Sequence, residues 1–361
     1  MNDFSHKLYD ILKKYPSFKL MGNVDAKVVK YELKNKSILV SIVDDIKPNC
    51  YTVSPYNMMI SYSKDELVKV DSKIQKYFAS ALIYGFEFIL KILKIDTVQT
   101  LNNYMFSTNF FDKGFKDIDI IELEKLAHEN YPKHTMLVRS VNKVQNPKLY
   151  EKLQNSGWIA LTSRQVYIFK DINICKKRQN YLRDKNLLNS DRYIFIELDI
   201  NDFKLFEKAE ELYNQLYLKK YSQHNIHFKA LYLKELQQQK LIHLRLLYDC
   251  MEDKYVGVVG LVGEDGVITA PIIGYDNSYD IKEALYRRLI AYAMEYAMQR
   301  KYLLNLSSGA SNFKVMRGAE ACLEYMFVNV KHLSSFKKII WKILSLIANY
   351  FYAPLLKRLK L

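Results

Sequence analysis

A polar cluster near the end of the chain carries residue types that suit anion binding. Ser307, Ser308, Lys314 and Arg317 follow an apolar segment at residues 302–306, which predicts a strand. Ligands of open α/β sheets bind at the carboxyl ends of strands, and the free N–H groups of a following helix favour an anion. Lys314 and Arg317 are three residues apart and share one helical face, which suits a phosphate or carboxylate. The alternative is a capped helix with a solvated basic face.

Tyr275 and Asp276 form a second candidate pair at the end of another predicted strand, before a helix expected from about residue 281. A carboxylate and a phenol act as general base and acid when burial moves their pKa values toward neutrality. We therefore predict a catalytic role for these two residues. The alternative is that Asp276 only caps the helix.

Two residues of the first half of the chain, Asn109 and Arg139, also lie at predicted strand ends. Their placement parallels that of the cluster near residue 307, which favours a cleft between the two halves with these residues on its wall. Taken singly, each is more typical of a structural role.

Several other chemistries lack their sequence signatures. The chain has no GxSxG nucleophile turn, no GxxxxGK[ST] phosphate loop and no HExxH zinc motif. His224 and His227 are three apart, but no third metal ligand lies near them in sequence. We expect no bound metal and no tightly bound cofactor, and the absent motifs disfavour a hydrolase, a nucleotide triphosphatase or a metalloprotease.

The length and the order of predicted elements favour two domains of mixed α/β structure. A chain of 361 residues is about twice the size of an ordinary domain, and 49% apolar residues are ample for a packed core. Strand and helix patterns alternate in residues 1–169 and again in residues 193–330. The pattern also predicts a long helix at residues 64–95 that is largely buried in its second half.

The formal net charge of +15 is concentrated in two segments. Residues 170–192 contain seven Lys/Arg and three Asp/Glu, and residues 331–361 contain seven Lys/Arg and no Asp/Glu. This distribution argues against a nucleic-acid-binding face covering the whole protein. We interpret residues 170–192 as a basic linker, in which Lys176, Lys177 and Arg178 either contact phosphates or are simply solvated.

The C-terminal segment, residues 331–361, predicts a basic amphipathic tail. Its uncharged run, Ile343 to Leu356, has 14 residues, fewer than the ~20 needed to span a bilayer, and Pro354 interrupts it. Lysines at both ends and several aromatic residues favour an interfacial helix on an anionic membrane. The alternative is a terminal helix docked on the protein itself. Four widely spaced cysteines indicate a reducing cytoplasm, so we expect a cytoplasmic protein, peripheral to the inner face of the membrane.

Two segments resemble a known family. NPKLYEKLQNSGWIALTSRQVYIF resembles the late helix–strand segment of the Gcn5-related N-acetyltransferase (GNAT) fold. KYVGVVGLV, ITAPIIGYD and LNLSSGASNFKVMRG, taken in order, are similar to the second half of tandem GNAT-like bacterial acyltransferases, including the Fem-type peptidyltransferases. The resemblance covers about residues 37 to 330 and implies two tandem GNAT-like domains.

What the resemblance implies is N-acyl transfer by direct attack of an amine on an acyl carrier. Tyr275 or Asp276 would serve as base or acid, and the cluster from Ser307 to Arg317 would line the cleft. The glycine-rich loop that binds coenzyme A in GNAT enzymes is missing, because the corresponding junction is GYDNSYDIKEALYRR. An acyl carrier protein or an aminoacyl-tRNA therefore gains weight over acyl-CoA as donor. The alternative function is a non-catalytic GNAT-like module that binds a lipid or a carrier protein.

Overall fold

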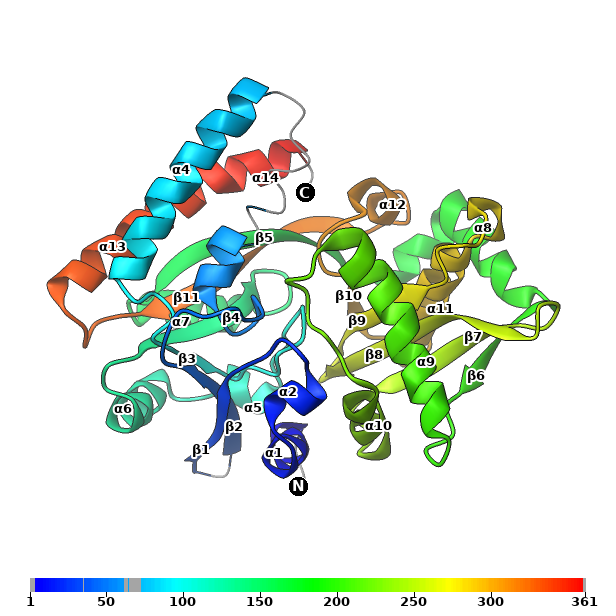
Figure 1. Cartoon of the computed structure of the whole chain (residues 1–361), viewed down its shortest axis with the longest axis horizontal. Coiled ribbons are helices and arrows are strands. Elements are labelled where there is room, and N and C mark those ends of the chain that lie inside the picture. Colours follow the sequence, from blue (N-terminus) through cyan, green and yellow to red (C-terminus); the bar gives the residue numbers. More distant parts are fainter. Residues whose placement is uncertain (1–3, 35, 62–63, 65–72, 360–361) are drawn as a thin grey trace.

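The strands in the part of the chain that the structure describes belong to one mixed sheet of eleven strands, ordered β1-β2-β3-β4-β11-β5-β10-β9-β8-β7-β6. The computed structural model (Figure 1) describes residues 4–34, 36–61, 64 and 73–359. The strands are β1 (Lys27–Leu33), β2 (Lys36–Val43), β3 (Val98–Leu101), β4 (Thr135–Asn142), β5 (Ile159–Phe169), β6 (Tyr193–Glu197), β7 (His243–Asp249), β8 (Lys254–Glu264), β9 (Val267–Tyr275), β10 (Leu303–Asn305) and β11 (Glu320–Asn329).

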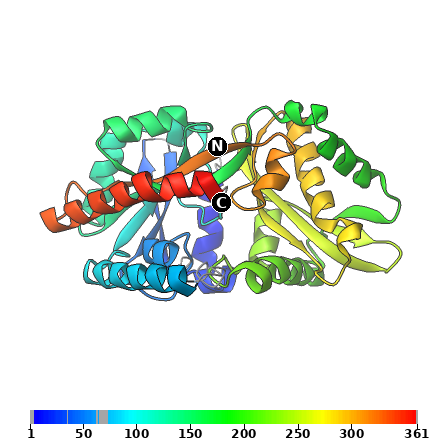
Figure 2. The same cartoon turned by 90° about the horizontal axis from the view of Figure 1, so that it is seen from above.

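Helices cover both faces of this sheet, as Figure 2 shows from above. The α-helices are α1 (Phe4–Lys14), α2 (Ser17–Leu20), α4 (Lys73–Ile92), α5 (Lys113–Lys116), α6 (Ile120–Asn130), α7 (Pro147–Asn155), α8 (Gln179–Asn186), α9 (Phe203–Asn214), α10 (Ala230–Gln238), α11 (Leu285–Arg300), α12 (Ser311–Val315), α13 (Ser335–Ile347) and α14 (Ala353–Leu359). The predicted mixed α/β class with a C-terminal amphipathic helix is confirmed.

At the middle of the sheet, a strand from the second half of the chain pairs with strands from the first half. β11 lies between β4 and β5 and pairs antiparallel with both. β5 in turn pairs with β10 on its other side. β11 lies within the predicted second domain, residues 193–330, yet both its hydrogen-bonded neighbours belong to the first half. The sheet is therefore continuous across the predicted domain boundary.

A tight hairpin and a crossover helix shape the second half. Asp265 and Gly266 have φ of 49° and 82°, so the turn between β8 and β9 uses left-handed backbone, as two-residue hairpins require. β9 and β10 are parallel and joined through α11, whose buried face includes Leu289 and Met294. This part of the fold matches its sequence pattern.

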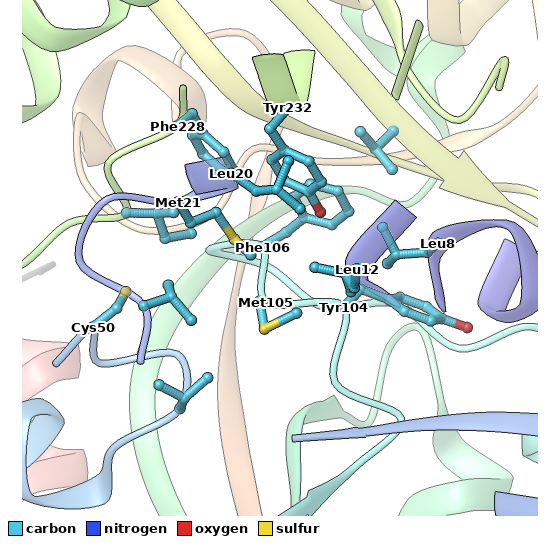
Figure 3. Close-up of a cluster of buried hydrophobic side chains, with 14 of the residues drawn as sticks. Leu8, Leu12, Leu20, Met21, Cys50, Tyr104, Met105, Phe106, Phe228 and Tyr232 are labelled. Atoms are coloured by element: carbon cyan, nitrogen blue, oxygen red, sulfur yellow. The ribbon is translucent and has the colours of Figure 1, made fainter. Parts of the chain in front are cut away.

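A hydrophobic cluster ties the N-terminal helices to both halves. Figure 3 shows Leu20 and Met21, at the end of α2, between Phe106 of the first half and Phe228 of the second. All four are fully buried or nearly so. The backbone continues the link, because Met21 forms a β-bridge with Phe228. The halves are thus joined by a packed core as well as by the sheet.

Residues 170–192, the predicted linker, are folded onto the second half. They form a 3₁₀ turn at Ile172–Lys177 and the helix α8, and they bury Tyr181 and Asp184 against α11. The three predicted phosphate contacts, Lys176, Lys177 and Arg178, remain exposed. This segment is therefore a packed connection with an exposed basic edge.

The long helix α4 differs from its prediction in burial. Its start at Lys73 leaves the earlier part of the predicted helix, residues 65–72, outside the described residues. Its second half exposes Phe88 (67%) and Ile92 (59%), so the expectation of a buried second half is wrong. The apolar periodicity predicted which residues share a face, but only one face, which includes Leu90 (0%), meets the protein.

The C-terminal segment docks on β5 through one face. Trp341, Leu344 and Leu356 are buried there. Asn349 accepts from the backbone N–H of Thr162 at 3.0 Å and donates to the carbonyl of Ala160 at 2.8 Å. Its opposite face is exposed. Residues 335–358 form one helix, long and apolar enough to cross a bilayer by length and composition alone, a test that docked helices also pass.

Candidate functional site

The polar cluster after β10 lies where two parallel strands part. β9 and β10 pair only as far as Thr269 and Asn305, while β9 continues to Tyr275. The chain after β10 stays with β5 instead, because the N–H of Leu306 donates to the carbonyl of Tyr167 at 3.0 Å. The predicted site residues Ser307 and Ser308 follow at this point, at the centre of the sheet.

Lys314 is buried and binds the backbone of this polar cluster. Only 3% of it is exposed, and its Nζ donates to the carbonyls of Leu306 (2.6 Å), Ser307 (3.3 Å) and Ser308 (2.8 Å). Burial, with the nearby Arg164, lowers the pKa of Lys314 to about 7. The ammonium holds the backbone at residues 306–308 in place and adds positive charge next to it. The alternative of a solvated basic face does not hold for this lysine.

Arg164 of β5 connects the two halves and was not among the predicted site residues. Its Nε donates to Glu324 Oε1 at 2.6 Å and its Nη1 to Ser307 Oγ at 3.0 Å. Its Nη2 donates to the carbonyl of Ser107 at 2.7 Å and to Thr108 Oγ1 at 3.1 Å. One guanidinium thus holds the serine cluster of the second half against the loop after β3 of the first.

Arg139 of β4 meets Arg164 at the same loop. Its Nη1 and Nη2 donate to the carbonyls of Phe106 (2.8 Å) and Ser107 (3.0 Å). Two guanidinium groups therefore share the Ser107 carbonyl. Burial lowers the pKa of Arg139 from its ordinary value. The predicted approach of Arg139 to the Ser307 cluster is thus made through Ser107 and Arg164.

Asn109 supports this loop from inside. It is 2% exposed, its backbone N–H donates to Ser140 Oγ at 3.2 Å, and its side-chain amide donates to the carbonyl of Asn102 at 2.5 Å. These bonds fix the backbone conformation of the loop. Its contacts are those of a residue that positions Arg139 and its partners.

Glu324 supplies the carboxylate of the site, and it too was missed. It is 2% exposed and lies at a register shift between β11 and β5. Oε1 is bound by Arg164, whereas Oε2 has no hydrogen-bond partner among the described residues. A buried polar atom without a partner is costly unless a water or a ligand satisfies it. We call Arg139, Arg164, Ser307, Lys314 and Glu324 the junction.

The junction concentrates positive charge. It holds two arginines, a lysine whose pKa is about 7 and one carboxylate in a largely buried setting, where each charge acts strongly. Such a setting favours an anion, or the negative charge that develops on a carbonyl oxygen during acyl transfer. The two charged residues that sequence reasoning missed are isolated in apolar strands, IALTSRQVYIF and LEYMFVNV, and that isolation was the available signal.

Asp276 lies outside this hydrogen-bonded group. Its Oδ1 accepts from Ser278 N (2.9 Å) and Ser278 Oγ (2.6 Å) in the turn after β9. Burial acts to raise its pKa, but the bonds from Ser278 and the nearby lysines outweigh it, so the pKa is lowered. Asp280 rather than Asp276 caps the helical turn that follows, through Lys282 N.

Tyr275 and Arg317 flank the parting of β9 and β10. The ring of Tyr275 lies 6.3 Å from that of Tyr286, which lies 5.0 Å from that of Phe313, next to Lys314. Arg317 pairs with buried Asp184 at 2.5 Å instead of facing the junction. Three predicted residues, Arg139, Ser307 and Lys314, therefore belong to the junction. Ser308 is bonded to it through Lys314, and Asn109 follows Thr108, which Arg164 binds.

The fold is that of two tandem GNAT-like units, as expected from the sequence, and similar solved structures support this fold. The sequence matches no family profile and no curated protein. The chain is similar in structure to FemX (TM-score 0.53, 8% identity, covering 93% of this chain and 92% of that one). It is also similar to L-PGS from Bacillus licheniformis (0.52, 12%, 95% and 96%). A third similar structure is the C-terminal domain assigned to a lysylphosphatidylglycerol synthetase of Agrobacterium fabrum (0.52, 9%, 96% and 93%).

Proposed function

We propose that this chain transfers an acyl or aminoacyl group from a carrier to an amine, and that the transfer takes place at the junction. The observation that carries the proposal is Oε2 of buried Glu324, which has no hydrogen-bond partner among the described residues. Glu324 belongs to a group with Arg139, Arg164 and Lys314, where the two GNAT-like halves meet. A buried base beside a positive field is what amine acylation requires.

The proposed role of each junction residue follows from the charged atom that it supplies. The amine nitrogen attacks the carbonyl carbon of the donor, a C–N bond forms, and the carbonyl electron pair moves to oxygen beside Arg139, Arg164 and Lys314. Glu324 Oε2 accepts a proton from the attacking nitrogen. When the intermediate collapses, the C–O bond of an ester or the C–S bond of a thioester breaks, and the leaving oxygen or sulfur takes that proton. The charge on the protein is restored at the end of the cycle.

Asp276 and Tyr275 are retained in the proposal as the alternative base and acid. The lowered pKa of Asp276 keeps it ionised at neutral pH, which makes it available but weak as a base. Its bonds to Ser278 hold it in a turn. Glu324 is the stronger candidate because one of its oxygens lacks a partner among the described residues.

The donor is an acyl-CoA, an acyl carrier protein or an aminoacyl-tRNA. Exposed Lys176, Lys177 and Arg178 support a phosphate-rich macromolecular carrier, as does the missing glycine-rich loop. Reversing these three charges weakens binding of such a carrier in a salt-dependent manner, measured by filter retention of total aminoacyl-tRNA and of acylated carrier protein. Unchanged affinity for both would remove the basic edge from the proposal.

Glu324→Gln tests the site. Labelled total aminoacyl-tRNA, acetyl-CoA and acyl carrier protein are each incubated with the protein and a cell extract as the source of acceptors, and loss of label from the donor is measured. We expect a rate about 10²-fold lower for Glu324→Gln. The control, Glu320→Gln, changes an exposed carboxyl on the same strand.

The variants Asp276→Asn and Tyr275→Phe are assayed in parallel. If Asp276→Asn abolishes turnover while Glu324→Gln preserves it, the turn after β9 is the catalytic site and the junction is structural. If the wild type consumes no donor but binds a lipid or carrier protein, the alternative function, a non-catalytic binding module, replaces the enzyme.

We further propose a cytoplasmic location with peripheral attachment to the inner face of the membrane. The basic tail, docked through one face with its other face exposed, is the support for this proposal.

A further inference from the structure

Two helices far apart in sequence expose apolar stripes on the same side of the molecule. In α4 the stripe comprises Tyr77 (80%), Tyr84 (63%), Phe88 (67%) and Ile92 (59%). Their spacings of seven, four and four residues place them on one side of the helix. Leu90, on the other side, is fully buried. The stripe of α4 therefore points away from the protein.

The tail repeats this arrangement. Its exposed stripe comprises Phe336 (56%), Ile339 (54%), Ile343 (44%), Leu346 (54%) and Tyr350 (71%), at spacings of three and four residues. The side that carries Trp341 and Leu344 is buried against the protein. Both helices thus use one side for docking and leave an apolar side uncovered.

The two helices both lie over the first half of the protein. α4 and the tail overlap in Figure 1, appear as separate helices in Figure 2, and run in opposite directions. Lys94, two residues after α4, lies near enough to Lys337 of α13 to add to the effect of burial in lowering its pKa. The end of α4 is therefore near the start of α13, and we call the two exposed stripes together the two-helix surface.

The charges on the two helices themselves are mainly positive. The tail carries seven Lys/Arg and no Asp/Glu. Glu87 is the one acidic residue of α4, and it is bonded to Lys91 (2.8 Å), Lys64 (2.5 Å) and Tyr56 (2.6 Å). The bonds from the two lysines and from Tyr56 lower its pKa to about 2. No acidic side chain of these two helices is left to attract a basic partner.

We propose that the two-helix surface docks on a lipid bilayer that contains anionic headgroups, with α4 and the tail both inserted at the interface. Apolar stripes flanked by cations suit such a bilayer, and exposed tyrosines suit the headgroup level. A second copy of the chain fits less well, since pairing this surface with itself would set the basic tails against each other. The inference rests on the peripheral attachment proposed above, to which it adds α4 and the anionic headgroups, and it does not depend on the proposed reaction.

Docking through this surface would also orient the junction. Asn349 of the tail holds Thr162, which is two residues before Arg164 on β5. The helix that meets the bilayer is therefore bonded to the strand that carries the central arginine.

Vesicle co-sedimentation of the full chain tests the proposal, with phosphatidylcholine vesicles prepared with and without phosphatidylglycerol. One variant combines Phe88→Glu and Ile92→Glu in α4, and another combines Ile339→Glu and Leu346→Glu in the tail. We expect each variant to partition at least about tenfold less onto the phosphatidylglycerol vesicles than the wild type. The wild type should bind phosphatidylcholine alone more weakly.

The matched control combines Met251→Glu and Ile281→Glu, which are 74% and 93% exposed on the second half. It adds the same two negative charges elsewhere and should partition as the wild type does. The proposal is overturned if the α4 variant binds like the wild type, or if the control loses as much binding as the α4 variant. It is also overturned if light scattering shows a wild-type dimer that the α4 variant dissociates. Donor consumption is measured separately, so failure of the reaction leaves this test intact.

Discussion

Removing the Arg164 side chain should destabilise the protein more than its partial exposure suggests. Arg164→Met leaves Glu324, which is 2% exposed, without its cation. The other hydrogen-bond partners of Arg164 are less affected by its removal. The Ser107 carbonyl keeps its bond from Arg139 at 3.0 Å, and hydroxyl partners can rotate. The loss of stability therefore comes mainly from the unpaired carboxylate. Breaking a buried ion pair in this way lowers the free energy of unfolding by about 3–5 kcal/mol.

A matched arginine isolates this effect. Arg245 is 18% exposed, close to the 17% of Arg164, but its partner Glu197 is 69% exposed. Arg245→Met should therefore cost about 1 kcal/mol or less, since the surviving carboxylate stays in water.

Urea unfolding at pH 7, followed by the fluorescence of the two tryptophans, measures both variants. The double variant Arg164→Met, Glu324→Gln should recover about 2 kcal/mol relative to the sum of the single changes, because the charge left unpaired is removed. Equal costs for Arg164→Met and Arg245→Met, or strict additivity of the double variant, would refute the reasoning.

Three further predictions concern other parts of the fold. Gly274→Ala should lower stability by about 2–3 kcal/mol in thermal unfolding, since a Cβ would lie 2.4 Å from the carbonyl oxygen of Leu212, while Gly85→Ala, where a Cβ meets nothing within 4 Å, should not destabilise. Asn349→Ala should free the tail from β5 and speed its cleavage in limited proteolysis, and unchanged cleavage would show that apolar packing alone holds it. Burial, with two nearby arginines, lowers the pKa of His243 to about 4 from 6.5, so the unfolded chain binds the extra proton first. Stability should therefore fall by up to about 3 kcal/mol as pH drops from 6.5 to 4, and His243→Gln should flatten this dependence in urea titrations.

The local elements were predictable because their signals are local. The hairpin turn at Asp265 and Gly266 and the helix start after Asp202 each follow from a short motif, and both occur in the structure. The position of β11 was not predictable, since an apolar strand pairs equally well with many neighbours. Lys314 was found because it belongs to a polar cluster.

The same limit explains the errors about burial. Arg164 and Glu324 sit in strands, where a charged residue ordinarily faces water, and only the exchange of strands between the halves encloses them. The apolar stripe of α4 was predicted to be covered, because periodicity identifies a face without identifying what lies against it. The site was thus predictable in part, and its carboxylate was not.

The insertion of β11 has a consequence for how the chain is made. During synthesis β4 and β5 emerge early. The strand that lies between them, β11, begins about 150 residues after the end of β5, so these contacts are far apart in sequence. Until then the nascent first half has two open strand edges, which are prone to wrong pairing. The final register of the central sheet is therefore set only after nearly the whole chain has left the ribosome.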